Sequence, residues 1–180
     1  VVVFDDIIWE AVRIVTSINE GTLEQRNERF MEYLQDGVPV KYKFAGQERT
    51  TLIKLYDYDM PEANQYKIIN QFTFKEHDKI RCDLVVMVNE LPLVVIELKS
   101  PSRIETDMDD AYKQIKHYQE KCPDLFVYNA FSAISDMLTS KAGTITSPED
   151  RFMEWKSKEG DYETTSVADY KTFFEGIFND

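Results

Sequence analysis

Residues 80–101 read I-R-C-D-L-V-V-M-V-N-E-L-P-L-V-V-I-E-L-K-S-P and contain two apolar runs. The runs cover 84–88 and 91–96, consist mainly of Val, Leu and Ile, and are separated by Asn89 and Glu90. Short apolar runs bounded by turn-forming residues are typical of buried strands. The stretch therefore predicts two adjacent strands joined by a tight turn.

Three charged side chains stand at the outer ends of these runs: Asp83, Glu97 and Lys99. Side chains alternate between the two faces of a strand, so Glu97 and Lys99 should share one face while Leu98 packs on the other. The turn would bring Asp83 back beside Glu97. Because buried charges are costly unless they pair with one another or bind a metal ion, we expect a functional site at this end of the hairpin.

The two carboxylates predict a cation site. Carboxylates that lie close together repel each other unless a hard cation is bound between them. Mg2+ is commonly held by one or two carboxylates together with water and phosphate oxygens, which suits Asp83 and Glu97. The backbone carbonyl of Leu98 could supply a further ligand. We expect Lys99 to orient an attacking water molecule and to stabilise charge that develops on a phosphate.

A helix is predicted over 107–121, directly after the hairpin. Thr106 can cap its N-terminus, and acidic residues fill its first turn, as the helix dipole favours. The face expected to pack on the sheet carries Met108, Ala111, Ile115 and Tyr118. Gln114 borders this face one turn before Tyr118, so both side chains should point toward Glu97. An ordinary amphipathic helix edge would show the same two residues.

Composition limits the partners of the chain. Its 180 residues are 43% hydrophobic, enough for one domain with a real core. The net charge of -12 opposes unaided binding to nucleic acid, so we expect the main nucleic-acid-binding surface to lie in another domain or subunit. Cys82 and Cys122 occur in a chain without a signal peptide or membrane-spanning run, which indicates reduced thiols in a cytoplasmic protein.

Two helices are predicted at the start of the chain, over 5–20 and 23–35. The second is capped by Thr22, with Gln25 at the reciprocal position of a capping box. Glycines that follow each helix favour its end there. The first helix should bury the apolar positions Ile8, Val12 and Val15.

The remaining segments favour an α/β fold with a mixed central sheet flanked by helices. Further strands are expected over 38–45, 50–58, 66–75, 125–128 and 132–135, with a turn at 46–47 between the first two. Residues 138–147 resemble a loop, and residues 156–166 form a polar segment that we expect to be flexible. Additional helices are expected over 148–155 and 168–178.

An Asp followed by a turn, a second strand and E-x-K resembles the pattern of the PD-(D/E)xK phosphodiesterases. The pattern is short, and a solvated hairpin end would carry the same residues. Other motifs accompany it: N-Q-F-T at 70–73, A-x-x-Q-x-x-x-Y at 111–118, P-D-L-F-x-Y-N at 123–129, S-D at 135–136 and R-F-M-E-W at 151–155. Together they resemble the N-terminal nuclease region of the restriction subunit of type I restriction-modification enzymes.

This resemblance implies a PD-(D/E)xK restriction-endonuclease-like core and a Mg2+-dependent endonuclease. Asp83, Glu97 and Lys99 match its catalytic residues, and Gln114 and Tyr118 match a Q-x-x-x-Y pair that supports the site or contacts the DNA backbone. In many nucleases of this type a Glu from the first core helix reaches the metal; Glu24 and Glu28 are the candidates here, although exposed helix charge is the ordinary explanation. The sequence departs from the family pattern at Cys82, Glu90 and Met137, and none of these changes removes a metal ligand.

The resemblance also implies partners. We expect one nuclease domain over 1–180, with a core at about 22–136 and a segment at about 148–180 that leads to a motor domain. The chain does not begin with Met, which suggests a fragment, and it contains no G-x-x-x-x-G-K-[ST] motif. ATP would therefore be used by the full-length subunit outside this chain. Double-stranded DNA and the modification and specificity subunits are the expected partners, and no membrane is expected.

A second hypothesis stays open. A nuclease-fold module could serve as a scaffold or docking domain without cutting DNA itself. Loss of one of the three catalytic residues would have favoured that alternative, and all three are present.

Overall fold

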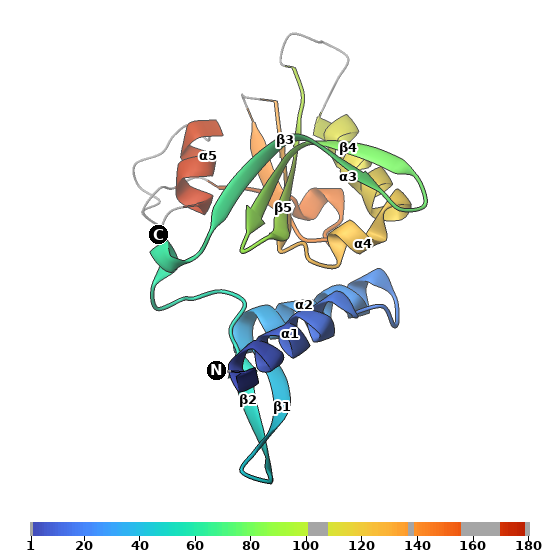
Figure 1. The fold of residues 1–180 in the computed structure, drawn as a ribbon. Coiled ribbons are helices and arrows are strands. Elements are labelled where there is room, and N and C mark those ends of the chain that lie inside the picture. The colour runs from blue at the N-terminus through green and yellow to red at the C-terminus, as the bar shows by residue number, and fades with distance from the viewer. Residues whose placement is uncertain (1, 101–107, 137–138, 156–169, 179–180) are drawn as a thin grey trace. The chain divides into compact units, whose positions relative to one another are not determined.

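The computed structural model describes residues 2–100, 108–136, 139–155 and 170–178 (Figure 1). The chain divides into two compact units, Val1–Gln65 and Tyr66–Asp180. The first contains two helices and a hairpin, and the second contains the large sheet. The predicted site residues Asp83, Glu97, Lys99, Gln114 and Tyr118 belong to the second unit, and the candidates Glu24 and Glu28 to the first.

Helix α1 (Val2–Thr16) begins the first unit and buries a different face from the one predicted. Its buried positions are Ile7, Ala11 and Val15, whereas Ile8 and Val12 are 41% and 44% exposed. The helix carries apolar residues on two neighbouring stripes, and spacing alone does not tell which stripe meets the hairpin. The prediction that Ile8 and Val12 are core residues is therefore wrong, while Val15 is confirmed.

Helix α2 (Leu23–Asp36) has the predicted capping box. The Gln25 backbone N–H donates to Thr22 Oγ1, and the Gln25 side chain accepts from the Thr22 backbone N–H at 3.0 Å. These bonds satisfy two N–H groups that the first turn would otherwise leave unpaired. Gly37, with φ of 91°, ends the helix in a conformation that glycine adopts without strain.

Strands β1 (Val38–Phe44) and β2 (Gln47–Ile53) form an antiparallel hairpin that extends from these helices (Figure 1). The turn is at Ala45 and Gly46, which both have positive φ, as a tight two-residue turn requires. The second strand thus begins earlier than the predicted range 50–58 and ends at Ile53. A short 3-10 helix, η1 (Pro61–Ala63), follows.

The second unit is built on a six-stranded mixed sheet in the order β3-β4-β5-β6-β7-β8. Its neighbouring strands are antiparallel except for β5 and β6, which are parallel and joined through α3. This arrangement confirms the predicted α/β class with a mixed sheet. The strands are β3 (Tyr66–Lys75), β4 (Lys79–Val88), β5 (Leu91–Leu98), β6 (Phe131–Ser135), β7 (Ser140–Gly143) and β8 (Met153–Glu154).

The β4–β5 hairpin turns where the sequence predicted. Val88 pairs with Leu91 across Asn89 and Glu90, whose φ angles are 50° and 67°. Positive φ at both central positions matches the twist of the flanking strands, which makes such turns common in hairpins. The register shifts by one residue between Val86 and Met87, so that Leu84 faces Ile96 and Asp83 and Glu97 come next at the same end.

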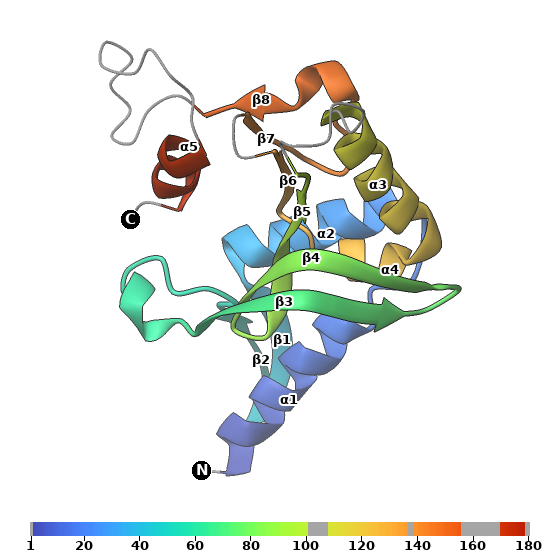
Figure 2. The ribbon, with the colours of Figure 1, turned by 90° about the horizontal axis from the view of Figure 1, so that it is seen from above.

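Helices cover both faces of the sheet. Helix α3 (Met108–Lys121) packs on β4, β5 and β6 through Ala111, Ile115 and Tyr118, which are buried as predicted. Helix α5 (Tyr170–Ile177) contacts β7 and lies on the other side of β6 and β7 (Figure 2). The predicted cap Thr106, Met137 and the segment 156–166 lie outside the described residues.

Three predictions after α3 are wrong. The expected strand at 125–128 is helix α4 (Pro123–Phe126), because Pro123 suits the first position of a helix. The expected loop at 138–147 contains β7. The expected helix at 148–155 is a 3-10 turn, η2 (Glu149–Arg151), followed by β8, and the Phe152 ring fills the space where a Cβ of Gly143 would lie.

Candidate active site

The hairpin end brings the three predicted catalytic residues together. Lys99 Nζ lies 2.9 Å from Glu97 Oε1, and the Leu98 backbone N–H donates to Asp83 Oδ2 at 2.9 Å. The Lys99 backbone N–H donates to the Ser135 carbonyl at 2.8 Å, which extends the parallel pairing of β5 with β6. Both neighbouring strands thus hold the E-x-K segment in place.

The three side chains differ in exposure. The Glu97 side chain is 7% exposed and the Lys99 side chain 19% exposed, whereas Asp83 is half-buried. Leu98 is 41% exposed, so the prediction that its side chain packs inside is wrong. Leu98 is the last residue of strand β5.

The surroundings of Glu97 disfavour its negative charge. Burial raises the pKa of Glu97, the hydrogen bond from Lys99 lowers it, and the Asp83 charge raises it again, with a net upward shift. An ionised Glu97 therefore gains from a nearby cation beyond what Lys99 supplies. The electrostatic environment of Glu97 therefore favours the binding of a cation.

The donor groups fit Mg2+ better than a metal that needs a full protein cage. Asp83 and Glu97 offer carboxylate oxygens, and Leu98 offers a carbonyl oxygen between Glu97 and Lys99. Among the described residues, no group of three or more His, Cys, Asp and Glu side chains could hold a metal ion. Mg2+ keeps several water ligands and typically needs only one or two carboxylates, so this set is sufficient for it.

Tyr118 reaches the site from α3, as predicted. Its hydroxyl oxygen lies 2.8 Å from the Arg81 carbonyl and 3.3 Å from Glu97 Oε2. Burial raises the pKa of Tyr118, with the Glu97 charge as the second cause, so the phenol stays protonated and can donate. Gln114 is half-buried one turn earlier, and its amide makes no hydrogen bond to another residue in the described part of the chain.

Gln71 is a site neighbour that the sequence reasoning missed. Its side-chain Nε2 donates to Asp83 Oδ1 at 3.2 Å. The residue is part of the N-Q-F-T motif at 70–73, which was a usable signal. The direction of its side chain could not be predicted from regular strand alternation, because Gln71 has a φ of 51° and departs from extended geometry.

The two cysteines are buried and free. Burial raises the pKa of Cys82 to about 12, with the Glu97 and Asp83 charges adding to the shift. A thiol with such a pKa is protonated at neutral pH and unreactive. Cys82 is therefore a packing residue beside the carboxylates.

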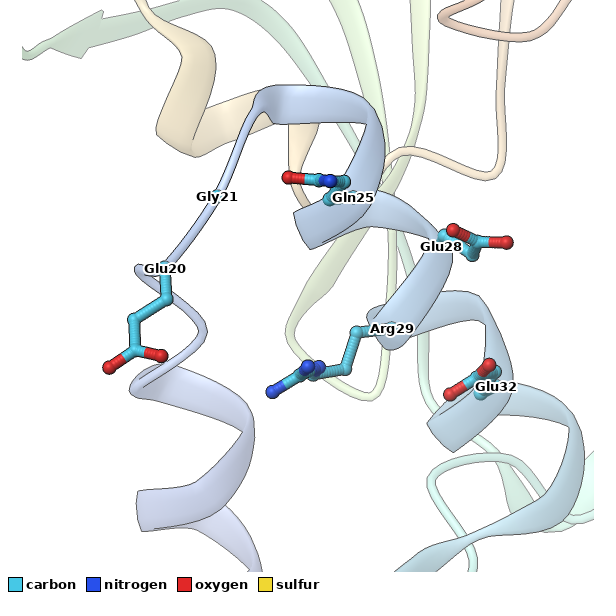
Figure 3. A pocket seen from close by; sticks show the side chains of 6 residues that line it. All are labelled: Glu20, Gly21, Gln25, Glu28, Arg29 and Glu32. Carbon is cyan, nitrogen blue, oxygen red and sulfur yellow. The ribbon is translucent and has the colours of Figure 1, made fainter.

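The candidate upstream glutamates belong to the other unit. Glu28 lines a hollow of about 360 Å³ on α2 (Figure 3) together with Glu20, Gly21, Gln25, Arg29 and Glu32. Glu24 lies in the first turn of the same helix. The participation of Glu24 or Glu28 in the expected cation site stays a prediction.

Comparison with known proteins places this chain in a family. The family model for the type I restriction enzyme R protein N terminus matches residues 5–151. The chain belongs to this family. It is 34% identical over 147 residues to the type I restriction enzyme HindI endonuclease subunit of Haemophilus influenzae. The aligned region covers 81% of the chain and 14% of that protein.

A second relative of the type I R-protein N-terminal family comes from an archaeon. The chain is 32% identical over 161 residues to the putative type I restriction enzyme MjaIXP endonuclease subunit of Methanocaldococcus jannaschii, covering 87% of the chain and 15% of that protein. The chain thus spans about one seventh of the length of these curated relatives. The resemblance to this family is confirmed. In the described part of the chain, no helix has the length and hydrophobicity needed to cross a membrane.

Replacing Glu97 with glutamine should stabilise the cation-free chain at neutral pH. The folded-state pKa of Glu97 is raised, so the stability that its protonated form contributes is lost as the pH rises through that value. Glutamine cannot ionise and avoids this loss. Thermal unfolding should show a higher midpoint for Glu97→Gln at pH 7, and the difference should disappear as the pH falls below about 4.5, the ordinary glutamate value.

Glu120→Gln is the matched control, because the Glu120 side chain on α3 is 76% exposed. Its unfolding midpoint should stay close to that of the wild type at every pH. A lower midpoint for Glu97→Gln than for the wild type at pH 7 would contradict the electrostatic description of Glu97.

Proposed function

We propose that this chain is the Mg2+-dependent endonuclease domain of a type I restriction enzyme and hydrolyses DNA phosphodiester bonds. The observation that carries the proposal is the convergence of Asp83, Glu97 and Lys99 at one end of the β4–β5 hairpin. Membership of the type I R-protein N-terminal family and similarity to endonuclease subunits support it. A PD-(D/E)xK fold is part of the same proposal.

Asp83 and Glu97 would bind the cation, with the Leu98 carbonyl as a third protein ligand. When bound, Mg2+ would polarise the scissile phosphate and neutralise charge that develops on its oxygens. Asp83 is held for this role through the Leu98 backbone N–H, and Glu97 through Tyr118 and Lys99. The carboxylates thus come from adjacent strands, and a register shift between Val86 and Met87 brings them level.

Lys99 would orient the attacking water and stabilise the phosphate in the transition state. Its ammonium group is near Glu97, and the Lys99 side chain is still 19% exposed, so a phosphate that approaches the hairpin end could reach it. An ammonium in a partly buried site stabilises a developing negative charge more strongly than the same group in water does.

The larger enzyme would supply what this chain lacks. ATP would be hydrolysed by a motor in the full-length subunit, because no phosphate-binding G-x-x-x-x-G-K-[ST] motif occurs here. The modification and specificity subunits would select the double-stranded DNA. The cytoplasm, where its DNA substrate enters, is the compartment that we propose.

The proposal is tested by incubating the assembled enzyme with plasmid DNA that carries its recognition site, ATP and Mg2+. Linear DNA is the expected product. ATP hydrolysis with intact DNA would contradict the proposal and would favour the alternative of a nuclease-fold scaffold.

Tyr118→Phe and Gln114→Ala should weaken cleavage without abolishing cation binding. Tyr118→Phe removes a donor to Glu97 and leaves the Arg81 carbonyl without its partner hydroxyl, and losses of this kind typically cost about 10-fold to 100-fold in activity. Gln114→Ala should be the more severe change, because the amide both donates and accepts. Cleavage rates and Mn2+ affinity would be measured for each variant.

His117→Ala, at an exposed position on the same helix, is the control and should cut at the wild-type rate. If Tyr118→Phe also cuts at the wild-type rate, its hydrogen bond to Glu97 has no part in the reaction.

A further inference from the structure

Gln71 has a backbone conformation that its place in β3 does not require. Four non-glycine residues in the described part of the chain have positive φ: Ala45, Gln71, Asn89 and Glu90. The other three lie in the tight turns of the two hairpins, where positive φ is needed. Gln71 lies inside a ten-residue strand. The left-handed conformation costs an L residue free energy, so some other interaction must compensate.

At Gln71 the half-buried side chains of β3 change from one face of the strand to the other. Asn70 pairs with Leu84 and Phe72 pairs with Cys82, so the register with β4 is continuous on both sides of Gln71. The half-buried positions, however, are Ile69 before it and Phe72 and Phe74 after it. Their alternation shifts by one residue at Gln71. The distortion is therefore local, and it lies opposite Asp83.

The Asp83 carboxylate is held from both neighbouring strands. Its Oδ1 accepts the Gln71 side-chain amide from β3 at 3.2 Å, and its Oδ2 accepts the Leu98 backbone N–H from β5 at 2.9 Å. Two donors on different oxygens fix the plane of the carboxylate. An ionised carboxylate has about four acceptor directions, so both oxygens keep room for a cation.

We propose that Gln71 is a positioning residue for the nuclease site: its strained backbone places the side-chain amide on Asp83 and so orients that carboxylate for the cation. The inference rests on the proposed function. Backbone strain is often retained at functional sites, where the surrounding structure maintains it. A residue present only for strand packing would not need an exposed amide that faces a carboxylate.

Two variants distinguish the effect of the Gln71 amide from the effect of its backbone strain. Gln71→Gly removes the amide and relieves the strain, because glycine adopts positive φ freely. Gln71→Met removes the amide but keeps a side chain of similar length and the strain. Thr73→Gly is the matched control, since Thr73 is an exposed residue two positions along the same strand without positive φ.

The unfolding midpoint and Mn2+ affinity of the full chain, and DNA cleavage by the assembled enzyme, would be measured for all three. Gln71→Gly should unfold at a higher temperature than the wild type, yet bind Mn2+ about 10-fold more weakly and cut about 10-fold to 100-fold more slowly. Gln71→Met should show the same functional losses without the stabilisation. Thr73→Gly should unfold at a lower temperature with wild-type Mn2+ affinity and cleavage.

Wild-type Mn2+ affinity and cleavage in either Gln71 variant would overturn the inference. Cleavage by a Glu97→Ala enzyme at the wild-type rate would instead overturn the proposed function. The two failures are therefore distinguishable in one set of assays.

Discussion

DNA cleavage should fall by at least about a thousandfold when Glu97 is replaced with alanine in the assembled enzyme, because a metal ion contributes several kcal/mol to the transition state and about 1.4 kcal/mol corresponds to each factor of ten. Glu97 is buried and contacts both Lys99 and Tyr118. Asp83→Ala should have the same effect. ATP hydrolysis should stay nearly normal, because we propose that a motor elsewhere in the full-length subunit carries it out.

Cleavage and ATP hydrolysis would be measured on the same samples, so that a variant that fails to assemble is recognised by the loss of both. Glu120→Ala, at an exposed position of α3, should retain both activities. Cleavage at the wild-type rate in Glu97→Ala would remove this residue from the site.

Replacing Lys99 with alanine should also slow cleavage strongly, by about 100-fold to 1,000-fold, the usual loss when one group that stabilises transition-state charge is removed. Unlike Glu97→Ala, this variant should still bind the cation. Lys99 is the ion-pair partner of Glu97, so its removal frees that carboxylate and should raise the affinity for Mn2+. Calorimetric titration of the chain with Mn2+ measures this difference.

Lys113→Ala is the control for charge alone, because Lys113 is an exposed lysine paired with Asp109 on α3. It should change neither Mn2+ affinity nor cleavage. Loss of cation binding in Lys99→Ala, or cleavage at the wild-type rate, would contradict the role given to Lys99.

The hairpin end could be predicted because few alternatives exist for its sequence. Two apolar runs around Asn89 and Glu90 permit one turn position, and the turn brings the outer ends of both strands together. The register shift between Val86 and Met87, which brings Asp83 level with Glu97, could not be predicted from the strand period. The face of α3 was predictable for a similar reason, since its apolar residues form one stripe. Local patterns were sufficient where only one arrangement buried the apolar residues.

The failures arise where tertiary contacts decided between alternatives. Helix α1 has two apolar stripes, and packing against β1 selects the one with Ala11. Residues 148–155 have helical propensity, but Phe152 packs over Gly143 and favours an extended conformation. Gln71 could not be found from periodicity, because its contact with Asp83 depends on a backbone angle that glutamine rarely adopts.

The most direct test of the site is a crystal structure of the chain grown with Mn2+, whose anomalous signal locates the ion. One peak is expected, in contact with a carboxylate oxygen of Asp83, a carboxylate oxygen of Glu97 and the Leu98 carbonyl, at about the 2.1 Å typical of Mg2+ sites. The absence of a peak between Asp83 and Glu97 in crystals that hold Mn2+ elsewhere would contradict it.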